Sequence, residues 1–221
     1  MTLQTVALPD DPALQQVLSA LSAEGAQALV VGGAVRNALL GEPISDIDIA
    51  TSARPAEPAR LAKAAGLRTV PTGFDHGTIT IIADGRGYEA TTFRRDVETD
   101  GRHAVVAYSD SIEEDARRRD FTMNALYATA DGRVLDPVGG LSDLAARKLR
   151  FVGDARARIT EDYLRILRFF RFLAWYGREA DMQALAACRE LRAGLSGISR
   201  ERIGHEIRKL LAAPDPSQAV A

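Results

Sequence analysis

The amino-acid sequence predicts an α/β (α+β) fold, in which a mixed region of strands and helices precedes an all-helical region. Strand-like segments and turn signals occur within the first 137 residues, whereas residues 138–221 carry apolar residues at helical spacing. The connector LDPVGG, residues 135–140, lies where the two patterns meet. We therefore expect two domains, residues 1–137 and residues 138–221.

The first domain is expected to alternate helices with short strands. Its predicted helices are residues 11–24, 35–40 and 55–65, with part of 112–128. Its predicted strands are residues 28–31, the segment around DID at 46–48, and the hairpin formed by 77–83 and 87–93. Residues 94–111 are polar and predict a mobile loop.

The second domain is expected to be helical throughout. Its predicted helices are residues 141–147, 160–176, 182–191 and 202–211. Residues 212–221 predict a frayed tail.

Composition narrows the class of protein. The 221 residues are 46% hydrophobic and 26% charged, as in ordinary globular domains. One cysteine, Cys188, excludes an intrachain disulfide, and we expect it in a helix core. No signal peptide or run of 18 apolar residues occurs, which predicts a cytoplasmic protein without a membrane partner. The net charge of −2 argues against general coating of nucleic acid but allows a local basic face.

The segment VVGGAVRNALLGEPISDIDIAT, residues 30–51, is the most informative part of the chain. On a strand, Asp46 and Asp48 would project from one face, with Ile47 and Ile49 directed to a core. Neighbouring carboxylates repel each other unless a cation lies between them, and hard oxygen ligands suit Mg²⁺. Two such ions can bind the attacking and leaving oxygens of a phosphoryl transfer. We therefore predict that Asp46 and Asp48 are catalytic metal ligands.

Gly32 and Gly33 precede a predicted short helix in the same segment. Glycines allow close backbone approach, and a helix N-terminus favours a bound phosphate. Arg36, in the first turn, can donate paired hydrogen bonds to phosphate oxygens. A glycine pair or a D-x-D pair alone is common without function, but together they predict a nucleotidyltransferase active site.

Glu89 is the predicted third carboxylate. It lies on the second strand of the hairpin, which should pair beside the strand that carries Asp48. A carboxylate there could help to hold metal or accept the proton of an attacking hydroxyl. A glutamate that faces solvent is the alternative.

Arg119 and Asp120, in ARRRDFT, run directly into an apolar segment. Arg119 could contact phosphate or base, and Asp120 could accept hydrogen bonds from ribose hydroxyls. A solvated charged face is the alternative. The three histidines, His76, His103 and His205, lack metal-ligand spacing and are expected in loops or at the surface, with His103 a candidate substrate contact.

The segment ITEDYLRILRFFRFLAWY, residues 159–176, predicts a helix with Thr160 as its N-cap. Three arginines follow Asp162 at intervals of three: Arg165, Arg168 and Arg171. Because apolar residues crowd the rest of this helix, its arginines need anionic or hydrogen-bonding partners. An aspartate acceptor beside an arginine donor can read the edge of cytosine or adenine. The acidic residues could instead stabilise the first helical turn.

Together these motifs resemble those of the class II tRNA nucleotidyltransferases, the CCA-adding enzymes and their bacterial poly(A) polymerase relatives. The resemblance covers residues 29–211 and includes GGAVRNALLGEPISDIDIAT, GYEATTFRRDVETDGRHA, EEDARRRDFTMNALY, LDPVGGLSDL and ITEDYLRILRFFRF. It implies a DNA-polymerase-β-like nucleotidyltransferase head and a helical neck. It also implies transfer of CMP and AMP from CTP and ATP to the tRNA 3′ end, with two Mg²⁺ ions and release of pyrophosphate.

The resemblance assigns the two Mg²⁺ ions to Asp46 and Asp48. It assigns Gly33 and Arg36 to the triphosphate, and Arg119 and Asp120 to phosphate and ribose. It assigns Asp162 and Arg165 to the base of the incoming CTP or ATP. Arg168 and Arg171 continue this row of arginines toward the nucleotide. Residues 96–108 match the flexible loop required for the change from CTP to ATP.

The chain departs from the family pattern in two places. Asn37 stands where the family usually has Asp, and we expect altered support of Arg36 without loss of metal. The chain also stops soon after the neck, whereas family members continue with domains that grip the tRNA elbow. Further C-terminal domains or a second subunit are therefore expected partners.

Two other functions stay open at this point. One is ATP-only polymerisation, or partial addition of CC or A alone. The segment VPTGFDHGTITI lacks the paired basic residues after glycine associated with poly(A) polymerases, and the complete loop disfavours CC-only addition. The other is a nucleotide- or RNA-binding module without efficient catalysis, which the intact Asp46 and Asp48 disfavour.

Overall fold

The computed structural model describes residues 4–73, 77–100 and 103–220, apart from the side chains of residues 96–100, 103–106 and 218. The chain packs as two compact units. Unit 1 comprises Met1–Asp96, Val106–Arg118 and Asn124–Val138, and unit 2 comprises Val97–Val105, Arg119–Met123 and Gly139–Ala221. Segments from before residue 138 contribute to both units. The predicted domain division at that residue stays a prediction.

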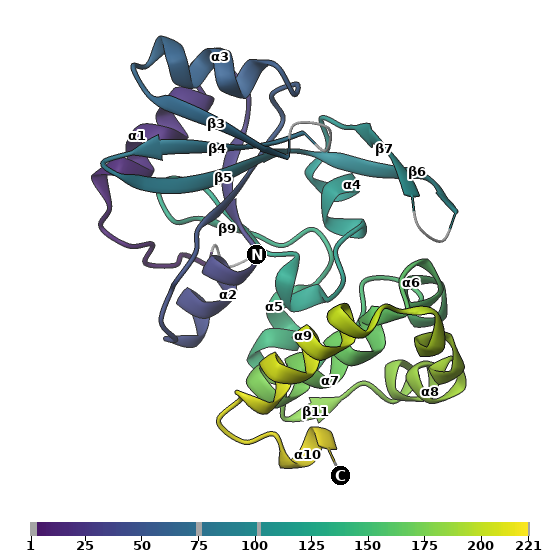
Figure 1. Cartoon of the computed structure of the whole chain (residues 1–221). Helices are drawn as coiled ribbons and strands as arrows, with labels where there is room; N and C mark the ends of the chain where they lie inside the picture. Colours follow the sequence, from purple (N-terminus) through teal and green to yellow (C-terminus); the bar gives the residue numbers. More distant parts are fainter. Residues whose placement is uncertain (1–3, 74–76, 101–102, 221) are drawn as a thin grey trace. The chain divides into compact units, whose positions relative to one another are not determined.

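Unit 1 is built on a seven-stranded sheet in the order β3-β4-β5-β2-β1-β8-β9 (Figure 1). Its strands are β1 Ala28–Val31, β2 Asp48–Thr51, β3 Arg68–Gly73, β4 Thr78–Ala83, β5 Arg86–Thr92, β8 Tyr127–Ala128 and β9 Val134–Leu135. The predicted hairpin is confirmed as the antiparallel pair β4 and β5. Neighbouring strands are antiparallel except β2 and β5, which run parallel. The short, mostly exposed strand β3 was not predicted, because its proline and polar residues hide the strand pattern.

The helices of unit 1 follow from local signals. They are α1 Pro12–Leu21, α2 Gly33–Leu40, α3 Glu57–Ala64 and α4 Ile112–Arg117. Asp11 caps α1, and the apolar face of that helix is buried. Helices α1 and α3 pack against each other and against β4 on one side of the sheet (Figure 1). Helices α1, α2 and α3 confirm the expected helices, with ends that differ from the prediction by at most three residues, and α4 covers the first part of the predicted segment 112–128.

Residues 94–100 and 103–108 form strands rather than the predicted loop. Strand β6, Arg94–Asp100, and strand β7, His103–Tyr108, make a separate two-stranded sheet, which we call the β6–β7 arm. The charges of RRDVETD obscured the strand signal, although HAVVAY is rich in strand-forming residues.

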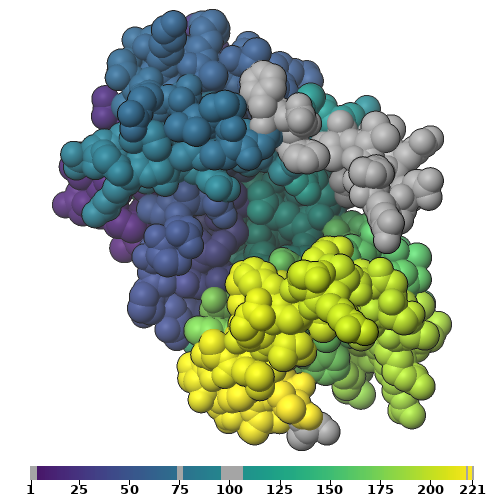
Figure 2. Space-filling model, in the orientation of Figure 1, coloured from purple at the N-terminus to yellow at the C-terminus, as the bar shows by residue number. Residues whose placement is uncertain are grey.

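Unit 2 is mainly helical, as predicted. Its helices are α5 Gly140–Ala145, α6 Ala155–Glu161, α7 Leu164–Tyr176, α8 Met182–Glu190, α9 Arg200–Leu211 and α10 Ser217–Val220, with a 3₁₀ segment at Arg192–Gly197. A small parallel pair, β10 Lys148–Leu149 and β11 Glu179–Ala180, was not predicted. Helices α7 and α9 lie side by side (Figure 1), and α9 and α10 are exposed on the face shown in Figure 2.

The core of unit 2 is aromatic. Phe121 packs on Phe151 with ring centroids 4.9 Å apart and on Phe172 at 5.0 Å. Phe151 stacks on Phe169 at 5.6 Å. These rings are at most 6% exposed, so α7 is fixed by burial of its apolar face. Among the described residues, no helix has the length and apolarity needed to cross a membrane.

Candidate active site

Three carboxylates share one pocket in unit 1. Asp46, Asp48 and Glu89 line a pocket of about 360 Å³, together with Ile47, Thr80 and Gly87. Asp48 and Glu89 are aligned partners on the parallel strands β2 and β5. This pairing confirms the prediction that the hairpin lies beside the strand bearing Asp48, and it brings carboxylates that are 41 positions apart to one place.

The predicted strand geometry around Asp46 is wrong in one respect. Strand β2 begins at Asp48, because its partner β1 ends opposite that residue at Val31. Ile49 is 1% exposed, as predicted, but Ile47 is half-buried and lines the pocket. Asp46 is exposed and accepts a hydrogen bond from the Ser45 hydroxyl at 3.2 Å. The two aspartates thus share a pocket although they do not share a strand.

The donor set in this pocket is suited to Mg²⁺. Carboxylate oxygens are hard ligands, and Mg²⁺ is usually held by one or two carboxylates together with substrate phosphates. In the part of the chain that the structure describes, no three His, Cys, Asp or Glu side chains form a ready-made metal cluster. The carboxylates that line the pocket fit an ion whose remaining ligands are substrate oxygens.

A glycine turn and a short helix lie beside β1. Gly32 has φ +70°, a conformation that glycine adopts without strain, and α2 begins at the next residue. Arg36, in the first turn, is 6% exposed. Its Nε and Nη2 donate to Asn37 Oδ1 at 3.1 and 2.8 Å, and its Nη1 donates to Asn124 Oδ1 at 2.5 Å.

Asn37 thus supports Arg36 through a neutral amide where a carboxylate was the usual expectation. Its Nδ2 also donates to the Pro43 carbonyl at 2.7 Å, which fixes the side chain toward Arg36. Asn124 was missed by sequence reasoning. The available signal was a single amide within the apolar segment FTMNALY, where a buried polar group needs a partner.

The arginine row on α7 is paired with carboxylates, as the sequence predicted. Arg165 binds Glu161 and donates to the Arg158 carbonyl at 2.5 Å. Arg168 binds Asp120, and Arg171 Nε donates to Glu206 at 2.6 Å. Burial works against the charged form of Arg168, but Asp120 and then Glu206 outweigh it and raise the pKa of this guanidinium.

The predicted helix over residues 160–176 is confirmed for Leu164–Tyr176, but its predicted start with Thr160 as N-cap is wrong, because the chain breaks at Asp162. Asp154 caps α6, so this helix starts early and contains Thr160, whose hydroxyl donates to the Arg156 carbonyl at 2.8 Å. Asp162 ends α6 in an extended conformation and accepts from the Leu164 amide at 3.1 Å.

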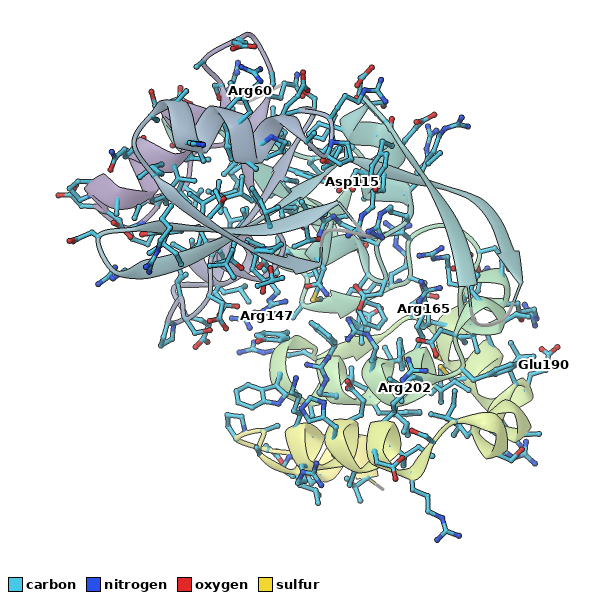
Figure 3. The ribbon with its side chains drawn as sticks, turned by 45° about the horizontal axis from the view of Figure 1, so that its top comes forward. Arg60, Asp115, Arg147, Arg165, Glu190 and Arg202 are labelled. Carbon is cyan, nitrogen blue, oxygen red and sulfur yellow. The ribbon has the colours of Figure 1, made fainter. Side chains whose placement is uncertain are left out.

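The other oxygen of Asp162 is held by a second helix. Arg202 Nη2 on α9 donates to it at 2.8 Å. Figure 3 labels Arg165 on α7 and Arg202 on α9, the residues that follow and hold this break. The side chains of Asp162 and Arg202 are 33% and 51% exposed, so this ion pair is open to solvent.

Arg119 and Asp120 are half-buried in unit 2. Asp120 faces the arginine row through Arg168, and the Arg119 carbonyl accepts from Arg158 Nη2 at 3.2 Å. His205 is exposed on α9, as expected, whereas His76 and the His103 side chain lie outside the described residues. Cys188 is buried in α8, as predicted, and burial raises the pKa of its thiol to about 12.

Two family models match this sequence. The poly A polymerase head domain matches residues 28–150, and the probable RNA and SrmB-binding site of polymerase A matches residues 181–221. The mitochondrial CCA tRNA nucleotidyltransferase 1 of Danio rerio is 47% identical over 189 residues, which are 82% of this chain and 43% of the relative. The chain spans about half the length of the curated relatives it matches.

Solved structures show the same similarity. The Bacillus stearothermophilus CCA-adding enzyme in complex with CTP matches with a TM-score of 0.86 and 37% identity, over 95% of this chain and 51% of that one. A tRNA nucleotidyltransferase complexed with a primer tRNA and an incoming ATP analog matches with a TM-score of 0.76 and 27% identity, over 92% and 58%. The predicted polymerase-β-like head is thus confirmed. The chain belongs to the poly(A) polymerase head-domain family, as a relative of the CCA-adding tRNA nucleotidyltransferases.

Proposed function

We propose that this chain is a template-independent nucleotidyltransferase that adds CMP and AMP, from CTP and ATP, to the 3′ end of tRNA and releases pyrophosphate. The observation that carries the proposal is the pocket shared by Asp46, Asp48 and Glu89, beside the glycine turn that opens α2. The names of the relatives, CCA tRNA nucleotidyltransferase and CCA-adding enzyme, support the same reaction.

In this proposal unit 1 carries out the chemistry. Asp46 and Asp48 hold Mg²⁺, which when bound stabilises the charge that develops on the reacting phosphate oxygens. Glu89 faces the same pocket and accepts the proton of the tRNA 3′ hydroxyl as that oxygen attacks the α-phosphate. Arg36 and the amides at the start of α2, after Gly32 and Gly33, orient the triphosphate.

Unit 2 selects the base in this proposal. Asp162 accepts from the exocyclic amine that cytosine and adenine share, and Arg165 donates to the adjacent ring nitrogen. Arg168 and Arg171 continue the row and keep it aligned. The nucleotide would replace Arg202 as a partner of Asp162, and this exposed ion pair can open at low cost.

The sugar and phosphates would contact Arg119 and Asp120. The two oxygens of Asp120 accept from the Phe121 amide and from Arg168, and a ribose hydroxyl would donate to the same carboxylate. The β6–β7 arm corresponds to the loop that the sequence resemblance links to the change from CTP to ATP.

Residues 181–221 match an RNA-binding family model, which supports contact between unit 2 and the tRNA. Additional RNA contacts would come from further C-terminal domains or a second subunit.

Nucleotide incorporation tests this function. The protein is incubated with Mg²⁺ and tRNAs that end before CCA, after C and after CC, each with labelled CTP, ATP, GTP or UTP. Ordered addition of C, C and A is expected. ATP-only tailing would assign the chain to the poly(A) polymerases, and retained nucleotide binding without incorporation would indicate a nucleotide-binding module.

A further inference from the structure

The β6–β7 arm leaves the main sheet of unit 1 at a well-defined root. The Phe93 amide donates to the Thr51 carbonyl at the end of β2, at 2.7 Å. The Phe93 carbonyl accepts from the Ser109 amide, at 2.8 Å, so these two residues close the base of the arm. Within the described residues, β6 and β7 pair with each other and with no strand of the seven-stranded sheet. An isolated two-stranded sheet is only marginally stable, so contacts at the root decide its direction.

Both strands of the arm are fastened at this root to adjacent carboxylates of α4. On the β6 side, the Arg94 amide donates to Asp115 Oδ1 at 3.3 Å. On the β7 side, the Ser109 hydroxyl donates to Glu114 Oε2 at 2.5 Å. Figure 3 labels Asp115 on α4, within unit 1. One turn of one helix therefore holds both strands.

Asp115 joins the arm to two further elements. It is 2% exposed, and its Oδ2 accepts from the Tyr127 hydroxyl on β8 at 2.7 Å. Its Oδ1 also lies 3.5 Å from Arg118 Nε, at the residue before Arg119. A carboxylate this deeply buried is stable because several donors surround it, so its position is tightly defined. The proposed chemistry leaves this buried group without a role.

We propose that Glu114 and Asp115 form a clamp that positions the β6–β7 arm and couples it to the nucleotide-contacting segment that starts at Arg119. They act through other residues and are positioning residues, not catalytic ones. The coupling part rests on the proposed function. The fastening of the arm does not, and it can be measured without any turnover.

Amide hydrogen exchange of the intact protein tests the fastening. Glu114→Ala removes the acceptor for Ser109, and exchange in peptides that cover residues 93 and 109 should rise about tenfold. Glu113→Ala is the matched control, because it removes the same charge from the same helical turn. The native Glu113 accepts from the Ser111 hydroxyl rather than from the arm. Exchange there should change less than about twofold. Equal exchange in the two variants would overturn the clamp.

Nucleotide kinetics test the coupling. Glu114→Ala should raise the KM for the nucleotide about tenfold with a smaller change in kcat, because the reacting pocket is untouched. Glu114→Gln should restore the KM, since an amide oxygen also accepts from Ser109. Faster exchange with an unchanged KM would overturn the coupling. Absence of incorporation by the unmodified protein would count against the proposed function, and the exchange result would still decide the clamp.

Discussion

The carboxylate pocket of unit 1 and the arginine row of unit 2 differ in how their charged side chains are arranged. In unit 1, Asp46, Asp48 and Glu89 bring like charges into one open pocket. In unit 2, Arg165, Arg168 and Arg171 each bind a carboxylate of the same chain. Like charges that share a pocket repel one another, whereas each arginine of the row is paired with an opposite charge.

This difference separates two kinds of functional residue. Like charges that the backbone holds together, through the pairing of β2 with β5, favour a cation from solution. Side chains that are already paired hold each other in position, and a ligand must compete with the existing partner to bind them. Substitutions in the carboxylate pocket of unit 1 should therefore affect activity more than stability. Substitutions of the buried pairs in unit 2 should affect stability first.

The largest effect is expected in the unit 1 pocket. Asp46→Ala or Asp48→Ala should reduce nucleotide incorporation by about 10³-fold, because the charge on the reacting phosphate is no longer stabilised. The midpoint of thermal unfolding should stay the same or rise, since repulsion is relieved. Glu42→Ala, an exposed carboxylate in the same loop that does not line the pocket, is the control. Retained activity in either aspartate variant would remove the metal assignment.

A buried pair in unit 2 should show the reverse behaviour. Glu206→Ala should lower the free energy of unfolding by about 3 kcal/mol, because Arg171 loses its partner in a site where the two side chains are 6% and 14% exposed. Urea denaturation measures this change. Glu201→Ala, exposed on the same helix, should cost less than about 1 kcal/mol. Equal costs would mean that the Glu206 pair is not a stabilising contact.

Substitution of Asp162 should change nucleotide selectivity, with a smaller effect on activity than in the unit 1 pocket and a smaller effect on stability than at Glu206. Asp162→Ala should reduce discrimination of CTP and ATP from UTP and GTP about tenfold, with less than about 1 kcal/mol lost in stability, because its ion pair is solvent-exposed. Arg202→Ala keeps the carboxylate and should keep the discrimination. Competition assays with mixed nucleotides measure both. Unchanged selectivity in Asp162→Ala would leave this residue a purely structural role.

The smallest expected effect concerns pH. Burial and then the hydrogen bond to Asp11 raise the pKa of Tyr88 to about 12, whereas an unfolded tyrosine titrates at about 10. The folded protein holds this proton more tightly, so the stabilisation is complete below pH ~10 and is lost as the pH rises to about 12. Tyr88→Phe should therefore lose less stability over this interval than the unmodified chain. Urea titrations at several alkaline pH values measure this; parallel losses would contradict the assignment. The Cys188 thiol also titrates in this pH range, but it does so equally in the unmodified chain and in Tyr88→Phe, so it does not affect the comparison.

The features that sequence predicted are those that local spacing determines. The strand at 28–31, the hairpin at 77–93 and the apolar face of α1 follow from short-range periodicity. The shared pocket of Asp46 and Asp48 follows from their separation of two residues. The residue roles derived from these motifs stay predictions, to be tested by the substitutions above.

The features that the sequence did not predict depend on partners that are distant along the chain. Asn124 supports Arg36 across 88 positions of sequence. Asp46 lies outside β2 because β1 ends where it does. The break at Asp162 follows from an earlier cap at Asp154, and its carboxylate is held by Arg202, 40 residues later. Each outcome depends on tertiary contacts that no short window of sequence contains.

The alignment of Asp48 with Glu89 makes the site sensitive to insertions in an uneven way. Side chains alternate between the faces of a strand, so one extra residue inside β5 before Glu89 would turn that carboxylate to the opposite face. The same residue added in the exposed turn around Gly85 could be absorbed as a longer loop. Length variation among natural or engineered variants should therefore concentrate at the tip of the β4–β5 hairpin and be excluded from the strand itself.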